Sequence, residues 1–137
     1  MEHVTDSQFR DRFTTLFFGG QDLPKKLVDR HIVYISVLIG LQPNRKYTEK
    51  ELNAELQKWT LLFGQRYNID HVTLRRYLID ERYLQRDTAG GSYEVAQTGQ
   101  PYTFDQSLAG LDLAVLIDAA KQEREMKKRQ HLNRPGA

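Results

Sequence analysis

The stretch that decides the fold is Thr73-Leu74-Arg75-Arg76-Tyr77-Leu78-Ile79-Asp80-Glu81-Arg82-Tyr83-Leu84-Gln85-Arg86. Its first half has the spacing of a helix, with Leu74 and Leu78 on one side, and its second half has the character of a β-strand. A glycine-bearing loop at 88–91 and a second strand-like segment at 92–95 follow. Helix, turn, strand, glycine loop and strand is the order of the second half of a winged-helix domain.

Helical patterns surround this block. Apolar residues at three- and four-residue spacings predict helices over 6–18, 24–41 and 105–130, and a further helix that starts at Thr48. Thr48 and Glu51 have the spacing of a capping box, and Asp70 is a good N-cap for a helix over 70–81. We therefore expect a mainly α fold with a small β-hairpin (α+β), in which N- and C-terminal helices flank a winged helix-turn-helix core. The expected division is a winged-helix-like domain over 1–100 and a C-terminal helix over 101–137.

Composition excludes several classes of protein. The 137 residues suffice for one domain with a hydrophobic core, and they are 39% apolar and 28% charged. There is no cysteine, which rules out disulfides, thiolate metal sites and cysteine nucleophiles. No apolar run approaches the ~20 residues that cross a bilayer, and no segment has the pattern of a signal peptide. A soluble cytoplasmic protein without a membrane partner is the expectation.

The net charge of +2 is unevenly distributed. Residues 1–120 hold 14 Lys/Arg and 16 Asp/Glu, whereas residues 121–137 hold six and two. The basic excess is thus confined to the C-terminal tail, and the body is slightly acidic. Since phosphate affinity requires clustered Lys and Arg, any nucleic-acid-binding face must be a local patch.

Several blocks together resemble a bacterial family. They are Leu23-Pro24-Lys25-Lys26, Arg45-Lys46-Tyr47-Thr48-Glu49-Lys50-Glu51-Leu52-Asn53, Thr73-Leu74-Arg75-Arg76-Tyr77-Leu78-Ile79-Asp80 and Leu84-Gln85-Arg86. Over roughly residues 16–95 the chain is similar to domain of unknown function 2087, whose members are described at most as candidate transcriptional regulators. Two departures touch the wing. Glu81-Arg82 stands where a glycine is expected before the first strand, and Glu94-Val95 replaces an expected aromatic residue.

The fold predicts where double-stranded DNA would bind. In a helix-turn-helix arrangement the N-terminal residues of the second helix meet base edges in the major groove, and arginine suits this role because its planar fork bonds guanine or phosphate bidentately. The candidate DNA-binding residues are His71, Thr73, Arg75 and Arg76 on that helix, Arg45 and Lys46 for phosphates near the helix start at Thr48, and Arg86 beside the wing.

Structural roles compete with these assignments. Arg75 and Arg76 lie about 100° apart on the helix, so they do not share one direction. The alternative to a DNA contact is that one of them pairs with a carboxylate on the preceding helix, such as Glu51 or Glu55. Asn53 is interpreted as a structural residue and Trp59 as part of the core. The loop over 88–92 carries no Lys or Arg, which favours a short structural hairpin over a DNA-contacting wing.

Two functions follow, and an enzyme is not expected. The first is a DNA-binding transcriptional regulator. The alternative is a winged-helix module for protein–protein contact or homodimerisation, with the apolar N- and C-terminal helices as the working surface. No catalytic motif, cofactor-binding loop or metal-ligand spacing occurs, and the four histidines are far apart in the sequence. We therefore predict no catalytic residue, no metal and no cofactor.

Overall fold

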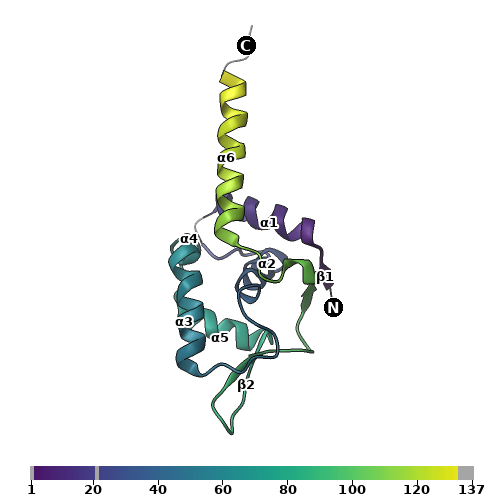
Figure 1. The fold of residues 1–137 in the computed structure, drawn as a ribbon, viewed down its shortest axis with the longest axis vertical. Helices are drawn as coiled ribbons and strands as arrows, with labels where there is room; N and C mark the ends of the chain where they lie inside the picture. Colours follow the sequence, from purple (N-terminus) through teal and green to yellow (C-terminus); the bar gives the residue numbers. More distant parts are fainter. Residues whose placement is uncertain (1, 21, 133–137) are drawn as a thin grey trace.

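The computed structural model describes residues 2–20 and 22–132. Its elements are β1 (Glu2–Val4), α1 (Asp6–Gly19), α2 (Leu27–Leu38), α3 (Glu49–Trp59), a π-helical turn η1 (Thr60–Gly64), α4 (Gln65–Tyr67), α5 (His71–Asp80), β2 (Leu84–Arg86), β3 (Tyr93–Val95), β4 (Tyr102–Phe104), a 3₁₀ turn η2 (Gln106–Leu108) and α6 (Leu113–Leu132). The chain is mainly helical with a small antiparallel hairpin, as the sequence predicts (Figure 1).

Helix α2 is the centre of the molecule. Every residue from 31 to 38 is buried, so this part of the helix has no side that faces solvent. A helix that is buried on all sides has to be covered on all sides, and α2 lies between α1 on one side and α3 and α5 on the other in Figure 1. All three of its buried polar residues have partners, and Asp29 pairs with Arg12 of α1. Trp59 donates from Nε1 to Ser36 Oγ at 3.0 Å, and His31 Nδ1 lies 2.7 Å from the Tyr83 hydroxyl. The expectation that Trp59 packs in the core is confirmed.

Side-chain caps fix the starts of three helices. Thr5 and Gln8 form a capping box at α1, and Thr48 and Glu51 form the expected one at α3. The Asp70 carboxylate accepts from the Thr73 backbone N–H at 2.7 Å and begins α5. These bonds satisfy backbone N–H groups that have no partner inside a helix. The structure thus confirms Thr48 and Asp70 as caps.

The helix that begins after Thr48 continues through Gly64. The helix passes through the π turn η1 into α4 and ends at Asn68, which adopts a left-handed backbone (φ 53°). A Cβ at position 64 would lie 2.9 Å from the Thr60 Cβ. Glycine is therefore required here for close packing inside the turn rather than for a break in the helix.

The hairpin is antiparallel, with Leu84 opposite Val95 and Arg86 opposite Tyr93. Tyr47 adds a further bridge, because its backbone N–H and C=O both bond to Tyr93, at 2.7 and 2.8 Å. The loop before α3 is thereby fixed to the hairpin. Arg82 has φ 67°, in the left-handed region, which explains why a glycine is expected in the turn before the first strand.

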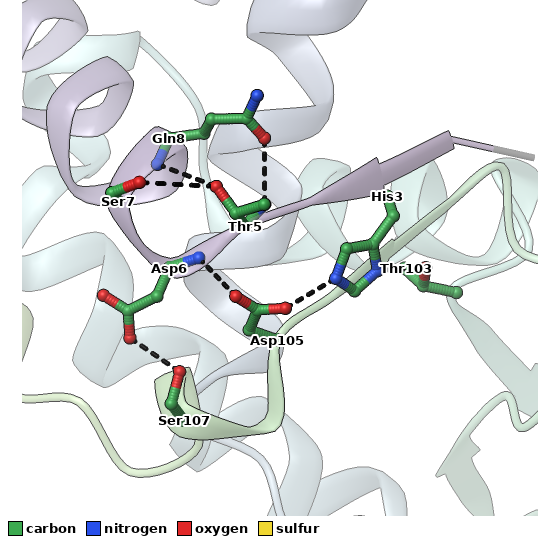
Figure 2. A network of polar contacts seen from close by, with 8 residues as sticks. All are labelled: His3, Thr5, Asp6, Ser7, Gln8, Thr103, Asp105 and Ser107. Carbon is green, nitrogen blue, oxygen red and sulfur yellow. Dashed lines mark hydrogen bonds and ion pairs between the residues drawn. The ribbon is translucent and has the colours of Figure 1, made fainter.

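A parallel pair of strands joins β1, near the N-terminus, to β4, and this pair is absent from the prediction. Polar side chains support it (Figure 2). His3 Nε2 lies 2.6 Å from Asp105 Oδ1, and Asp105 Oδ2 accepts from the Asp6 backbone N–H at 2.7 Å. Ser107 donates to the other carboxylate, Asp6 Oδ2, at 2.7 Å. The hydrogen bond from His3 lowers the pKa of Asp105.

The prediction of a helix starting near residue 105 is wrong. Helix α6 begins only at Leu113, because Asp105 is held against β1 and Gly110 has a left-handed backbone (φ 76°) that interrupts helical geometry. Leu108 and Val115, which a single helix over 105–130 would place on one face, are separated. Leu108 is fully buried in η2, whereas Val115 is 63% exposed on α6. Residues 133–137, the end of the predicted basic tail, lie outside the described residues.

Buried His31 makes stability depend on pH. Burial lowers the pKa of His31, although Glu81 Oε2 lies 3.9 Å from its Nε2. Below about pH 6.5, His31 is therefore protonated more readily in the unfolded chain than in the folded chain. We expect the free energy of unfolding to fall as the pH drops from about 7.5 to 5.5, and a His31→Gln variant to show a flatter profile in denaturant titrations. Equal slopes for the two proteins would contradict this assignment.

Candidate nucleic-acid interface

The bridge between Tyr47 and Tyr93 brings three predicted arginines into one region. The guanidinium carbons of Arg75 and Arg86 each lie 5.7 Å from the centre of the Tyr93 ring. That of Arg45 lies 4.4 Å from the centre of the Tyr47 ring. Residues from the loop before α3, from α5 and from β2 therefore meet around two buried tyrosines. Sequence reasoning gave Tyr93 no role, because an aromatic residue in a strand is ordinarily read as core.

Arg75 is engaged inside the fold. Its Nη1 lies 3.1 Å from Glu49 Oε1 and donates to Asn53 Oδ1 at 2.7 Å, and its side chain is only 18% exposed. The expectation that one arginine pairs with a carboxylate of the preceding helix is confirmed, with Glu49 rather than Glu51 or Glu55 as the partner. The structural role expected of Asn53 is also confirmed, since its amide accepts from an arginine of α5. Arg75 thus fixes α5 against α3.

Arg45 is also paired, although it is more exposed. Its Nη2 lies 3.1 Å from Glu51 Oε2. The other oxygen of Glu51 accepts from the Thr48 backbone N–H at 2.9 Å, and the hydrogen bonds with Thr48 and Arg45 lower the pKa of this carboxyl. The N-terminus of α3 is therefore already occupied by a carboxylate. Lys46 is exposed beside it, and within residues 2–20 and 22–132 it has no ion pair.

The outward face of α5 carries Val72 and Arg76. Leu74 and Leu78 are fully buried, and residues 72 and 76 lie on the opposite side of the helix. Val72 is 52% exposed. Arg76 is exposed as well, and no carboxylate of the described residues lies within ion-pair distance of it. Its guanidinium carbon lies 5.6 Å from the centre of the neighbouring Tyr77 ring.

The two remaining candidates on α5 are half-buried. His71 is the first residue of the helix, and the backbone N–H of Thr73 donates to the Asp70 carboxylate that caps the helix.

The outward face of α5 ends at an acidic residue, because the exposed Asp80 follows Arg76 by four residues. The usable part of this face is therefore the first two turns of α5.

The β2–β3 hairpin, which the sequence predicts as a wing, is short and has no cation in its loop. The Asp87 carboxylate accepts from the Ala89 backbone N–H at 3.0 Å, and Gly91 provides the left-handed residue of the turn (φ 68°). Between residues 87 and 92 there is no Lys or Arg. Arg86, the last residue of β2 before this loop, is thus the basic residue that the hairpin contributes to the region.

Residues 21–95 match a family described as "Uncharacterized protein conserved in bacteria (DUF2087)". The chain belongs to the DUF2087 family. The match covers more than half of the chain and runs from the residues before α2 to the end of β3. It therefore contains every residue of the candidate interface. No curated protein and no solved structure matches the chain.

The helices outside the DUF2087 segment complete its core. Phe13 of α1 packs edge-on against Phe63 of η1, with ring centres 5.5 Å apart, and Phe17 does the same at 6.0 Å. Helix α6 contacts α1 through two cations. Lys121 Nζ lies 5.5 Å from the Phe17 ring centre, and the Arg124 guanidinium carbon lies 4.3 Å from the Phe18 ring centre.

Among the described helices, none is long and apolar enough to cross a membrane.

Proposed function

We propose that this DUF2087 protein is a DNA-binding transcriptional regulator of winged-helix type, cytoplasmic and without a cofactor. Three helices, α2, α3 and α5, precede the β2–β3 hairpin, and Tyr47 bridges to β3 in the place of a first short strand. In this arrangement α5 is the helix that enters the major groove. The observation that carries the proposal is the exposed Arg76 on the outward face of α5, free of carboxylates among the described residues.

The candidate residues have different roles in the proposed DNA binding. Arg76 bonds a guanine edge, and Val72 packs against a thymine methyl group, the apolar feature of the major groove. His71 and Thr73 lie beside them at the start of α5. The phosphate contacts come from Lys46, Arg86 and the partly exposed Arg45, since such contacts need charge without a fixed geometry. Arg75 acts as a positioning residue, because Glu49 and Asn53 already hold its guanidinium.

The first test is the salt dependence of binding to a random duplex, measured by fluorescence anisotropy. Lys46, Arg86 and Arg45 together give about three phosphate contacts. The affinity should therefore fall roughly 40-fold between about 50 and 200 mM salt. Binding that is undetectable at micromolar protein and low salt would refute the proposal, since even nonspecific DNA binding is strongest under those conditions.

Homodimerisation through the terminal helices is the second candidate. The second half of α6 projects away from the body (Figure 1), and every residue from 121 to 132 is exposed. Val115, Ala119, Gln122 and Met126 are all exposed and follow one another at the alternating spacings of four and three residues that pack in a coiled coil. This row supports a helical contact with a second copy, which would place two α5 helices on two half-sites.

A further inference from the structure

Helix α6 changes character where it leaves the body. Leu113 and Ile117, in its first half, are buried against the rest of the protein. With about 3.6 residues per turn, the same side of the helix continues through positions 121, 124, 128 and 131, with position 127 beside them. Within residues 121–132, an arc of about 120° on this side carries basic residues alone. We call these residues the basic face of α6: Lys121, Arg124, Lys127, Lys128 and His131.

The charge of the basic face is not neutralised inside the protein. Aromatic rings of α1 hold Lys121 and Arg124 by cation–π contacts, which order the two side chains and leave their charge without a counterion. Lys127 lies 3.2 Å from Glu123, but these side chains are 73% and 67% exposed, and such surface pairs contribute little. No carboxylate of the described chain lies within ion-pair distance of Lys121, Arg124 or Lys128.

The charges of the chain favour a polyanion as the partner of this face. Residues 121–132 hold five Lys/Arg and two Asp/Glu, a balance of +3, whereas the body is slightly acidic. A negative partner is therefore attracted to this half of α6 in particular. An anionic membrane is disfavoured, because a helix on a lipid surface presents an apolar face to it. The second half of α6 has only Met126 and Leu132 as apolar residues, and they lie on different sides of the helix.

We propose that the basic face of α6 binds the phosphate backbone of double-stranded DNA without sequence preference. A duplex carries about one negative charge per 1.7 Å of its axis. A row of cations at intervals of about 5 Å therefore meets phosphates in any register. Such contacts carry no sequence information. The inference does not depend on DNA recognition by α5, since the second half of α6 and the β2–β3 hairpin lie at opposite ends of the molecule (Figure 1).

The test is a titration of the ¹⁵N-labelled full chain with a random duplex of about 10 base pairs, one helical turn. Two-dimensional ¹H–¹⁵N spectra should show saturable shifts for the amides of residues 121–131. The dissociation constant should lie near the weak end of nonspecific binding, about 10⁻⁴ M at physiological salt, and should rise with salt. Arg76→Ala should leave these shifts unchanged, so a failure of the α5 proposal and a failure of this one are distinguishable.

Two double variants test the basic face itself. Arg124→Gln with Lys128→Gln removes two charges from the face and should weaken the binding seen at residues 121–131 at least about tenfold. Arg129→Gln with Lys58→Gln removes two charges from outside the face and should weaken it less than about threefold. Circular dichroism shows that α6 remains helical in both. The proposal is overturned by an absence of shifts over 121–131 at about 1 mM duplex, by equal losses in the two double variants, or by equally tight binding of polyglutamate, which would indicate an acidic protein as the partner.

Discussion

Replacing Phe13 with alanine should lower the free energy of unfolding by about 3–5 kcal/mol, the range for deletion of a buried aromatic side chain. Phe13 is fully buried, stacks on Phe9 with ring centres 5.5 Å apart and packs edge-on against Phe63. Its loss removes apolar contact and leaves a cavity between α1 and η1, because a close-packed interior collapses only partly. Chemical denaturation followed by the fluorescence of Trp59, which lies in the same cluster, measures the effect.

Leu61→Ala is the matched control for Phe13→Ala. Leu61 lies in η1 beside Phe63 but is 86% exposed, so its truncation should change the free energy of unfolding by less than about 0.5 kcal/mol. Since α1 precedes the residues that match DUF2087, a large loss from Phe13→Ala would show that the folding unit extends beyond that segment. Equal, small losses from both variants would show that α1 is not part of the core.

Arg75→Ala should cost about 1.5–3 kcal/mol of stability, the range for hydrogen bonds of charged groups, and Arg76→Ala less than about 0.5 kcal/mol. The two residues are adjacent and chemically identical, so each is the control for the other. Arg75 bonds Asn53 and pairs with Glu49 across the contact between α3 and α5, whereas Arg76 lies on the outward face. Denaturation midpoints of the two variants measure the difference.

Arg75→Lys adds a sharper test of the positioning role. A lysine keeps the charge but lacks the planar fork of donors that reaches a carboxylate and an amide together. We expect this variant to recover only part of the lost stability. If Arg75→Ala were as stable as Arg76→Ala, the pairing of α3 with α5 through Arg75 would be wrong.

The sequence predicts the helical part of this fold well because its signals are local. The bonds of Thr48 to Glu51 and of Asp70 to Thr73 span three residues, so the residue types at those spacings suffice to locate the starts of α3 and α5. The hairpin is signalled in the same way by strand-like segments on both sides of Gly90 and Gly91. For the same reason the buried row of Leu74 and Leu78 could be read from its spacing.

The features that sequence reasoning missed depend on contacts between distant residues. Strands β1 and β4 have three residues each, too few for a recognisable alternation, and pair across about a hundred positions of the chain. The start of α6 is displaced because Asp105 bonds to His3 and to the backbone of Asp6. Likewise, a carboxylate partner for Arg75 was expected, but its identity as Glu49 depends on how α3 and α5 cross.

The most direct test of the account is the affinity of Arg76→Ala for duplex DNA, compared with Lys58→Ala. Each variant removes one positive charge, but Lys58 lies in the last turn of α3, where it pairs with Glu55 on the surface. We predict that Arg76→Ala loses about 1–3 kcal/mol of binding free energy, or roughly 5- to 150-fold in affinity, while Lys58→Ala changes it less than about twofold. Wild-type affinity in Arg76→Ala, with the variant folded, would contradict DNA recognition by the outward face of α5.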